Sequence, residues 1–257
     1  MACGIIIIDK PEGWTSQDVV SKLRGVFRER RAGHGGTLDP MATGVLVVLV
    51  GRAAKACEYL VSDRKRYRAT LRLGMTTDTE DTTGTVLTTS NAIPTNEELQ
   101  AVLPRFRGEI LQTPPMYSAL KVNGEKLVDL ARKGIEVERQ SRDITVYSIE
   151  PQVISESDGI YKITVSCSKG TYIRTLCKDI GAALGCGGCM ESLRRVQAGE
   201  YSIAQSVPLA TLLETADPGQ YLRTVDSMFC NYPAVTLTAK QELRCRNGNS
   251  FSIALAD

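Results

Sequence analysis

The chain has 257 residues, 42% hydrophobic and 23% charged, which is typical of a globular protein able to bury a sizeable core. Its net charge of only +2 gives no whole-chain argument for a nucleic-acid partner. No apolar run approaches the roughly 18 residues of a membrane span, and residues 4–8 are too few for a signal peptide's apolar region. Because eight cysteines occur at scattered spacings, we expect reduced thiols and a cytoplasmic protein with no membrane association.

The first seventy residues contain four regular patterns. Residues 5–8 are four isoleucines and predict a strand. Thr15 with Asp18 three residues later predicts a capping box, and the apolar residues that follow at helical spacing predict a buried helix face. Residues 45–50 are all apolar and predict a buried strand. Around Tyr67, apolar and basic residues alternate, which predicts a half-buried strand with a basic face.

The other segments add helices and strands in no regular alternation. Residues 76–85 are acidic and rich in threonine, and they predict a loop. Helices are predicted at 52–61, after a Thr95–Glu98 capping box, over 125–133 and from Thr171 to Leu184, and strands near 143–154 and 160–167. Because this order is not a βαβ repeat, we predict an α+β fold with a large mixed or antiparallel sheet.

Positive charge is concentrated in two parts of the chain. Residues 20–68 contain eleven Lys or Arg against four acidic residues, a local charge of +7, so the remainder carries −5. Such an asymmetry would attract a polyanion, although basic side chains also commonly solvate a helix face. Residues 113–142 contain six further Lys or Arg and predict an inserted basic flap.

The glycine-rich segment at residues 33–51 carries the chain's only histidine and leads directly into the predicted strand at 45–50. Pro40 disfavours the helical region for Asp39, so that carboxylate should project from an extended turn. Glycines beside it allow close approach of another molecule. From these residues alone, a catalytic carboxylate and an ordinary strand-entry loop with a capping aspartate are equally compatible with the pattern.

Several motifs in this order resemble the TruB family of tRNA pseudouridine synthases. They are GHGGTLDPMATG with GRAAK (residues 33–44 and 51–55), DKPEGWTS (9–16), KRYRATLRLG (65–74), QTPPMYSALKVNGEKL (112–127), KGTYIRTL (169–176) and ESLRR (191–195). The resemblance covers roughly residues 4–215, and several motifs in the same order and spacing are more specific than any single one.

The resemblance implies a pseudouridine synthase fold and a cofactor-free reaction, in which uridine 55 of the tRNA T-loop becomes pseudouridine. The base would be flipped out and its glycosidic bond cleaved and re-formed through C5. The implied roles are nucleophile for Asp39, ion-pair partner for Arg174, and stacking and proton-transfer group for Tyr67. A carboxylate in a partly desolvated pocket needs such a cation to remain ionised.

The resemblance also implies how RNA is bound. The implied RNA contacts are His34, Lys10, Gly35, Gly36, Thr37, Leu193, Arg132 and Lys133. The expected partner is the T-arm of tRNA, with no obligate protein partner and a monomeric chain. Residues 1–215 would form the catalytic domain, with the flap at 113–142, and residues 216–257 a linker and a partial or reduced RNA-binding region of the PUA type.

Three alternative functions remain open at this point. One is a relative that depends on a guide RNA, although the basic flap resembles the stand-alone members. Another is a catalytically idle RNA-binding or RNA-folding module, which an intact set of Asp39, Tyr67 and Arg174 argues against. The third is a glycoside hydrolase, which needs two opposed carboxylates, whereas Asp39 has no second acid in its loop.

Cys186 and Cys189 form a CxxC pair whose spacing is typical of metal sites. A structural zinc site usually needs four ligands, and only Cys167 and Cys177 lie nearby in sequence. We therefore interpret the pair as incidental and predict no metal site.

Overall fold

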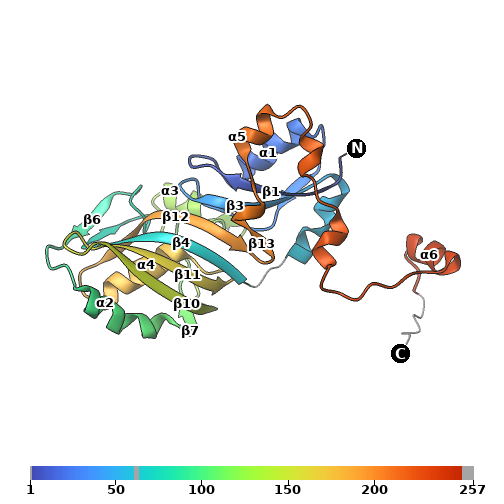
Figure 1. Ribbon diagram of the computed structural model, residues 1–257. Helices are drawn as coiled ribbons and strands as arrows, with labels where there is room; N and C mark the ends of the chain where they lie inside the picture. Colours follow the sequence, from blue (N-terminus) through green and yellow to red (C-terminus); the bar gives the residue numbers. More distant parts are fainter. Residues whose placement is uncertain (1, 61–63, 251–257) are drawn as a thin grey trace.

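The computed structural model describes residues 2–60 and 64–250, and it confirms an α+β fold built on a ten-stranded mixed sheet (Figure 1). The strand order is β14 (Val207–Pro208), β1 (Gly4–Lys10), β3 (Thr43–Val50), β12 (Gly188–Ala198), β4 (Arg64–Leu73), β11 (Ile160–Ser168), β10 (Arg142–Ser155) and β7 (Gly108–Gln112), with β2 (Ala32–His34) on β3 and β13 (Tyr201–Ser202) on β12. Strand β1 is parallel to β14 and β12 is parallel to β3, and the remaining pairs are antiparallel.

Strands β1 and β3 are covered on both faces, which explains why their sequences are continuously apolar rather than alternating. Helices α1 (Ser16–Val26) and α5 (Leu209–Glu214) pack against one face. The 3-10 helices η1 (Gly51–Leu60) and η5 (Val225–Phe229) pack against the other. The strands predicted at residues 5–8 and 45–50 are confirmed, each as part of a longer strand.

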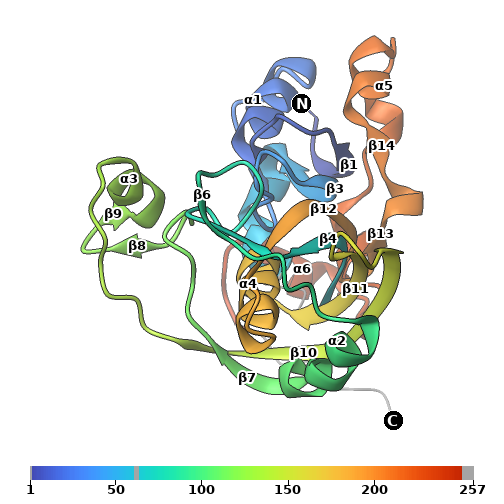
Figure 2. The same cartoon turned by 90° about the vertical axis from the view of Figure 1, so that its left-hand side faces the viewer.

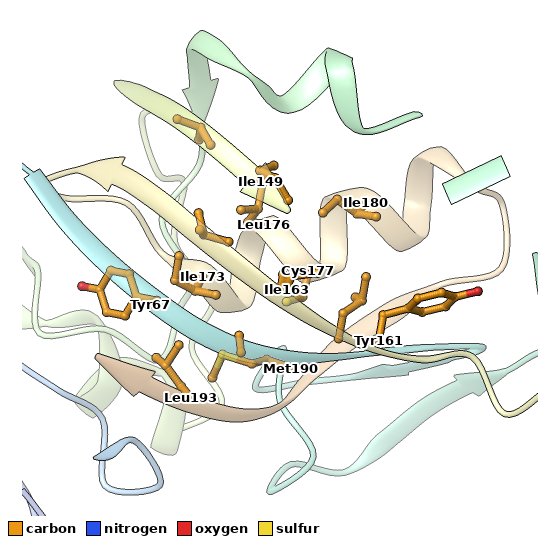
Figure 3. Close-up of a cluster of buried hydrophobic side chains, with 14 of the residues drawn as sticks. Tyr67, Ile149, Tyr161, Ile163, Ile173, Leu176, Cys177, Ile180, Met190 and Leu193 are labelled. Atoms are coloured by element: carbon orange, nitrogen blue, oxygen red, sulfur yellow. The ribbon is translucent and has the colours of Figure 1, made fainter. Parts of the chain in front are cut away.

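The half of the sheet formed by β4, β11, β10 and β7 is covered on one face only. Helices α4 (Ile173–Ala183), α2 (Asn96–Val102) and η2 (Leu103–Phe106) enclose an apolar cluster against it (Figure 3). The alternation predicted around Tyr67 is confirmed, because Tyr67 and Ala69 are buried while Arg66 and Arg68 are exposed on the other face. In Figure 3 the Tyr67 ring lies at the edge of the cluster and its hydroxyl points away from the apolar side chains.

Both predicted capping boxes are present. The Thr15 hydroxyl accepts a hydrogen bond from the Asp18 amide, and the Asp18 carboxylate accepts one from the Thr15 amide. Thr95 and Glu98 make the same reciprocal pair at the start of α2. These bonds satisfy amides that would otherwise lack partners in the first helical turn, so both helices begin where their sequences indicate.

The flap at residues 113–142 projects from the body and differs from its prediction (Figure 2). Its contents are a hairpin of β8 (Lys121–Val122) and β9 (Glu125–Lys126), followed by α3 (Leu127–Arg132). Asn123 and Gly124 both have positive φ, at 52° and 90°, as a two-residue hairpin turn requires. The helix predicted over 125–133 was therefore wrong at its start, because the turn places residues 125 and 126 in a strand.

The helix predicted from Thr171 also begins later than expected. Helix α4 starts at Ile173, and its N-cap position is Tyr172, which makes no side-chain capping bond. The Gln112 side chain takes over that role, since it accepts from the Tyr172 amide and donates to the Tyr172 carbonyl. Arg174 is consequently the second residue of the helix, close to the sheet edge.

Strand β12 lies at the centre of the sheet, between β3 and β4, yet the sequence pattern predicts no strand there. Its sequence contains two adjacent arginines, and register shifts against β4 occur between Met190 and Ser192 and between Arg195 and Gln197. Each shift moves the side chains that follow to the other face, so an alternating apolar pattern cannot develop.

Smaller elements complete the description. They are β5 (Met75–Thr77), β6 (Val86–Thr89), η3 (Ile203–Gln205), η4 (Pro218–Tyr221) and α6 (Ala239–Arg246). The predicted linker packs onto the body at Arg223, which exchanges two 2.8 Å backbone hydrogen bonds with Ile5, whereas α6 lies apart from the body (Figure 1). Residue 61 of one predicted helix, and residues 251–257, lie outside the described residues. Within the described ranges, no helix is both long and apolar enough to cross a membrane.

Candidate active site

The loop that carries Asp39 joins β2 to β3 and is fixed from two sides. The Ser16 hydroxyl, at the start of α1, donates to the Leu38 carbonyl and accepts from the Leu38 amide at 2.8 Å. The Pro40 carbonyl accepts from the Gly13 amide at 2.9 Å, and the Ala42 amide closes a turn onto the Asp39 carbonyl at 3.0 Å. The side chain of Asp39 therefore projects from a backbone that is held on both sides of it.

Lys10 supports this loop from the interior of the protein. Its side chain is fully buried, and its ammonium donates to the carbonyls of Pro11, Trp14 and Pro40 at 2.9, 2.6 and 3.2 Å. Burial lowers the Lys10 pKa to about 8. An RNA contact by Lys10 is contradicted by this geometry, because its three donors are used inside the protein.

Arg195 also anchors the loop. It ends the ESLRR motif at residues 191–195, but it was not among the predicted site residues. Its side chain is 1% exposed on β12, and its guanidinium donates to the carbonyls of Val45, Gly36 and Thr37 at 2.7, 3.0 and 3.2 Å. A buried guanidinium is tolerated only when its donors are satisfied, so the loop conformation and Arg195 depend on each other. A charged residue at an inward position of an unrecognised strand was the signal that could have revealed it.

Gly44, which ends the motif, can only be glycine in this packing. Its φ is 101°, and a Cβ there would lie 2.2 Å from the Arg195 carbonyl oxygen. We expect Gly44→Ala to lower the free energy of unfolding by roughly 3 kcal/mol or more, because backbone strain and overpacking add. Gly134→Ala is the matched control, since Gly134 also has positive φ, at 72°, but open space around it. Urea denaturation of both variants measures the difference, and equal losses would contradict the close contact.

The central feature of the site is an ion pair between residues 135 positions apart. Nε of Arg174 donates to Oδ2 of Asp39 at 2.9 Å, and the arginine is 4% exposed whereas the aspartate is half-buried. The two remaining nitrogens of the guanidinium donate to the carbonyls of Thr79 and Tyr117 at 2.9 and 2.7 Å. Oδ1 of Asp39 accepts no hydrogen bond from the described part of the chain, so this oxygen stays available to a substrate.

The acidic loop packs against the same arginine, and it spans residues 78–85 rather than the predicted 76–85, because residues 76 and 77 belong to β5. Oδ2 of Asp81 lies 3.8 Å from Nε of Arg174, and the Asp81 side chain is 7% exposed. Glu80 has a φ of 64° and is buried, with its carboxylate accepting from the Thr175 hydroxyl and the Lys178 ammonium of α4 at 2.6 Å each. This loop is therefore part of the support of the site, which its composition did not indicate.

Tyr67 and Lys65 enter the site from β4. Burial raises the pKa of the Tyr67 hydroxyl, and the positive charge of Arg195 offsets only part of that effect, so the hydroxyl is neutral near pH 7. Burial, and then the charge of Arg195, lowers the pKa of Lys65 to about 8. The site thus contains a carboxylate, a neutral phenol and a cation that loses its proton readily.

These side chains surround a pocket of about 300 Å³. Asp39, Tyr67, Arg174, Thr37 and Leu193 line it together, and the flap contributes residues 118–120. The structure therefore brings three implied catalytic residues and two implied RNA contacts together at one cavity, and their roles stay predictions.

The other implied RNA contacts do not line the pocket. His34, Gly35 and Gly36 directly precede Thr37, which does line it. Burial lowers the pKa of His34, and its Nδ1 has no hydrogen-bond partner within the described residues. Arg132 and Lys133 are exposed on the flap, outside the pocket lining.

Comparison with known proteins places this geometry in a family. The model described as TruB family pseudouridylate synthase (N terminal domain) matches residues 24–173, and that of the tRNA pseudouridylate synthase B C-terminal domain matches residues 174–225. The chain belongs to the TruB family. It is 47% identical over 248 residues to a tRNA pseudouridine synthase B of Clostridium kluyveri, covering 96% of this chain and 85% of that protein. The Dechloromonas aromatica protein of the same name is 44% identical, covering 97% and 84%.

Solved structures similar to this TruB-family chain include a Cbf5–Nop10–Gar1 complex, with 29% identity and a TM-score of 0.66. An H/ACA ribonucleoprotein bound to a substrate RNA containing 2′-deoxyuridine gives 26% and 0.65. Both matches cover 88% of this chain but only 61% and 60% of the solved chains, so this chain spans about three fifths of their length. The division of the TruB-family chain at residue 215 stays a prediction.

The CxxC pair of this TruB-family chain lies inside the protein. Cys186 and Cys189 are buried, and burial raises the pKa of the Cys189 thiol to about 11. Among the described residues, no group of three or more His, Cys, Asp or Glu side chains is placed to hold a metal ion.

Proposed function

We propose that this chain converts uridine to pseudouridine at position 55 in the T-loop of tRNA, with the pocket around Asp39 as its active site. The observation that carries the proposal is the Asp39–Arg174 ion pair, which lies beside Tyr67 in a pocket of about 300 Å³. Membership of the TruB family, and similarity to bacterial proteins named tRNA pseudouridine synthase B, support the reaction type and the tRNA substrate.

In this reaction the C1′–N1 bond of a flipped uridine breaks, a C1′–C5 bond forms, C5 loses a proton and N1 gains one. Arg174 holds Oδ2 of Asp39, so Oδ1 is the oxygen directed at the sugar or the base. Because Arg174 is itself held by two backbone carbonyls, the carboxylate is fixed before the substrate arrives. No oxidant, metal or second substrate is needed for an isomerisation of this kind.

Tyr67 would stack on the extracted base and use its neutral hydroxyl in proton transfer. We expect Tyr67→Phe to reduce the single-turnover rate by about 10²-fold or more, while RNA affinity changes by less than about threefold. Tyr161→Phe is the control, because Tyr161 is also a fully buried tyrosine, on the neighbouring strand β11. Rapid-quench kinetics at saturating RNA measure the rates, and a wild-type rate for Tyr67→Phe would restrict this residue to stacking.

The basic flap would bind phosphates of the T-arm. Arg132 and Lys133 are exposed, and the Lys133–Glu125 ion pair at 3.4 Å is a surface pair of little strength. Each phosphate contact makes the slope of log affinity against log salt concentration more negative by about 0.7 to 0.9. We expect neutralising both residues to flatten that slope by about one to two units and to leave the single-turnover rate at saturating RNA nearly unchanged.

Filter binding of a T-arm hairpin across a salt series measures this slope. Removal of two exposed charges outside the flap, Arg105 and Lys162, is the matched control and is expected to leave the slope unchanged. An unaltered slope for the flap variant would show that the flap does not contact phosphate.

The experiment that tests the function uses the purified chain and a T-arm RNA hairpin, with no other RNA or protein added. Product must be detected by a pseudouridine-specific chemical reaction, because the isomer has the mass of uridine. Formation of pseudouridine at the T-loop position supports the proposal. Absence of product from a protein that binds the hairpin would favour an RNA-binding or RNA-folding module instead.

The same experiment separates this function from a guide-dependent one. The solved relatives in H/ACA particles are 26–29% identical to this chain, whereas the bacterial relatives are 44–47% identical. We therefore propose that the chain acts on tRNA in the cytoplasm as a stand-alone monomer. A glycoside hydrolase is disfavoured, because the second carboxylate, Asp81, is 7% exposed beside the same Nε of Arg174 and does not line the pocket.

A further inference from the structure

Glu80 has a backbone conformation that glutamate rarely adopts. Its φ is 64°, in the left-handed region, and among the described residues the other non-glycine residues with positive φ are Arg28 and Asn123. Those two residues are exposed, whereas Glu80 is 7% exposed. Glycine would adopt this conformation without strain. A glutamate at this position therefore indicates that its side chain makes contacts that offset the strain.

The Glu80 carboxylate joins the acidic loop at residues 78–85 to helix α4. Its Oε2 accepts a hydrogen bond from the Thr175 hydroxyl and its Oε1 accepts one from the Lys178 ammonium, at 2.6 Å each. Thr175 is 1% exposed, and the Lys178 side chain is 38% exposed. Because both carboxylate oxygens have partners in α4 and Glu80 does not line the catalytic pocket, this carboxylate connects two elements and does not face a substrate.

Helix α4 is a firm support for this contact. Its side chains Ile173 and Leu176 pack into the apolar cluster against the sheet (Figure 3). Thr175 directly follows Arg174, and Lys178 lies four residues after it, which places it one turn further along the same face of the helix. The helix that carries Arg174 is thus also the helix to which the Glu80 carboxylate is bonded.

Glu80 directly follows the residue whose carbonyl holds the arginine. Nη1 of Arg174 donates to the Thr79 carbonyl at 2.9 Å, so the peptide between Thr79 and Glu80 carries this acceptor. On the other side, the Met190 amide donates to the Glu80 carbonyl at 3.0 Å, and the Thr82 amide donates to the Met190 carbonyl at 2.9 Å. The loop is therefore bonded to β12 through its backbone and to α4 through the Glu80 side chain. Rotation of the peptide that bears the Thr79 carbonyl would break one of these attachments.

We propose that Glu80 is a positioning residue for the reaction, because it ties the Thr79 carbonyl to α4 and so orients the guanidinium of Arg174. The inference rests on the proposed function, since it takes Arg174 and Asp39 as the catalytic ion pair. Without the carboxylate, the arginine would keep its charge but lose a fixed acceptor, and the Asp39 carboxylate would lose its fixed orientation. A displacement of about 1 Å near the reacting atoms can lower a rate about 10²-fold.

The decisive variant is Glu80→Gly, which removes the carboxylate and at the same time relieves the backbone strain. We expect its single-turnover rate with saturating T-arm hairpin to fall about tenfold or more, while RNA affinity stays within about threefold of wild type. Glu80→Gln keeps an acceptor for Thr175 but removes the negative charge that faces Lys178. It should also be slower, and it provides the test if the glycine variant does not fold. A wild-type rate for the folded variants would overturn the inference, as would a loss confined to RNA affinity.

A double-mutant cycle with Arg174→Lys tests whether Glu80 acts through Arg174. A lysine lacks the planar fork that reaches the Thr79 carbonyl, so adding Glu80→Gly should lower the rate by less than about threefold further. An equal loss in both backgrounds would contradict action through the arginine. Glu191→Gln is the matched control, because it removes a half-buried carboxylate that pairs with Arg72 at 3.4 Å and does not line the pocket, and it should turn over like wild type.

Hydrogen exchange in the RNA-free protein gives a readout that does not depend on turnover. The Nε proton of Arg174 is buried and bonded to Asp39, so NMR should show slow exchange, and the signal is identified by its absence from Arg174→Lys. We expect Glu80→Gly to accelerate this exchange about tenfold or more, while the amide of Leu46 in the core exchanges as in wild type. Unchanged exchange at Nε would overturn the inference. Failure of wild type to form pseudouridine would overturn the proposed function instead.

Discussion

Asp39→Asn is expected to lower the single-turnover rate of pseudouridine formation by roughly 10⁴-fold or more, while RNA affinity stays within a few-fold of wild type. The amide keeps the size of the carboxylate but cannot act as a nucleophile. Arg174 would lose its charged partner yet keep its bonds to two backbone carbonyls, so the fold should persist. Rates come from rapid-quench experiments with the T-arm hairpin, and affinities from filter binding.

Asp143→Asn is the matched control, because Asp143 is an exposed aspartate on β10 that does not line the pocket, and it should behave like wild type. Substantial residual product from Asp39→Asn, above what spontaneous deamidation of the asparagine would supply, would contradict the role of Asp39. A large loss of RNA affinity would instead indicate that the carboxylate orders the loop around it.

Arg174→Lys is expected to reduce the single-turnover rate by about 10²- to 10³-fold even though it preserves the charge. The guanidinium reaches Asp39, the Thr79 carbonyl and the Tyr117 carbonyl from three nitrogens arranged as a planar fork. A lysine presents one compact ammonium at the end of a flexible chain and cannot span the same three acceptors. At least one buried acceptor therefore loses its partner, and the melting temperature should fall together with the rate.

Arg107→Lys is the comparison variant, since Arg107 donates to a single carbonyl, that of Ile149, and a lysine can reproduce one such bond. It should leave both the rate and the melting temperature near wild type. If Arg174→Lys also turned over at nearly the wild-type rate, positive charge alone would suffice, and the shape of the guanidinium would not matter.

Local signals predicted several elements of this fold correctly. The Thr15 and Thr95 capping boxes predicted the starts of two helices, because a capping bond spans only three residues and needs no tertiary information. The alternation around Tyr67 predicted a strand with one buried face, since burial on one side alone imposes a period of two. In both cases the physical cause lies within a few residues of the pattern.

The errors arose where distant parts of the chain decide the conformation. Strand β12 contains Arg194 and Arg195, and the buried Arg195 is tolerated only because carbonyls from residues 36–45 accept its donors. Helix α4 begins after Thr171, because Gln112, 60 residues earlier than Tyr172, provides the capping bonds. Neither partner can be recognised from the local sequence.

The candidate site likewise contains residues that the sequence identified and residues that it did not. Family motifs identified Asp39, Tyr67 and Arg174, and these residues meet at one pocket. Arg195 and Glu80 were missed. Arg195 lies in the ESLRR motif, but its role, like that of Glu80, follows from burial and from hydrogen bonds across the fold. Lys10 was assigned to RNA for the converse reason, since a motif does not reveal that a lysine is buried.

The central position of β12 has a consequence for how the protein is made. Strand β12 is the only strand in the described sheet that joins β3, which follows the Asp39 loop, to β4, which carries Tyr67. Synthesis reaches β12 after about three quarters of the chain, so the two halves of the sheet must wait for it before they can pair through it. A nascent chain that ends before residue 188 therefore carries all three implied catalytic residues without a complete sheet to mount them on. The pocket around Asp39 can therefore form only after β12 has been synthesised. Because Gly44 has no side chain, the backbone of Arg195 on β12 can then pack directly against it.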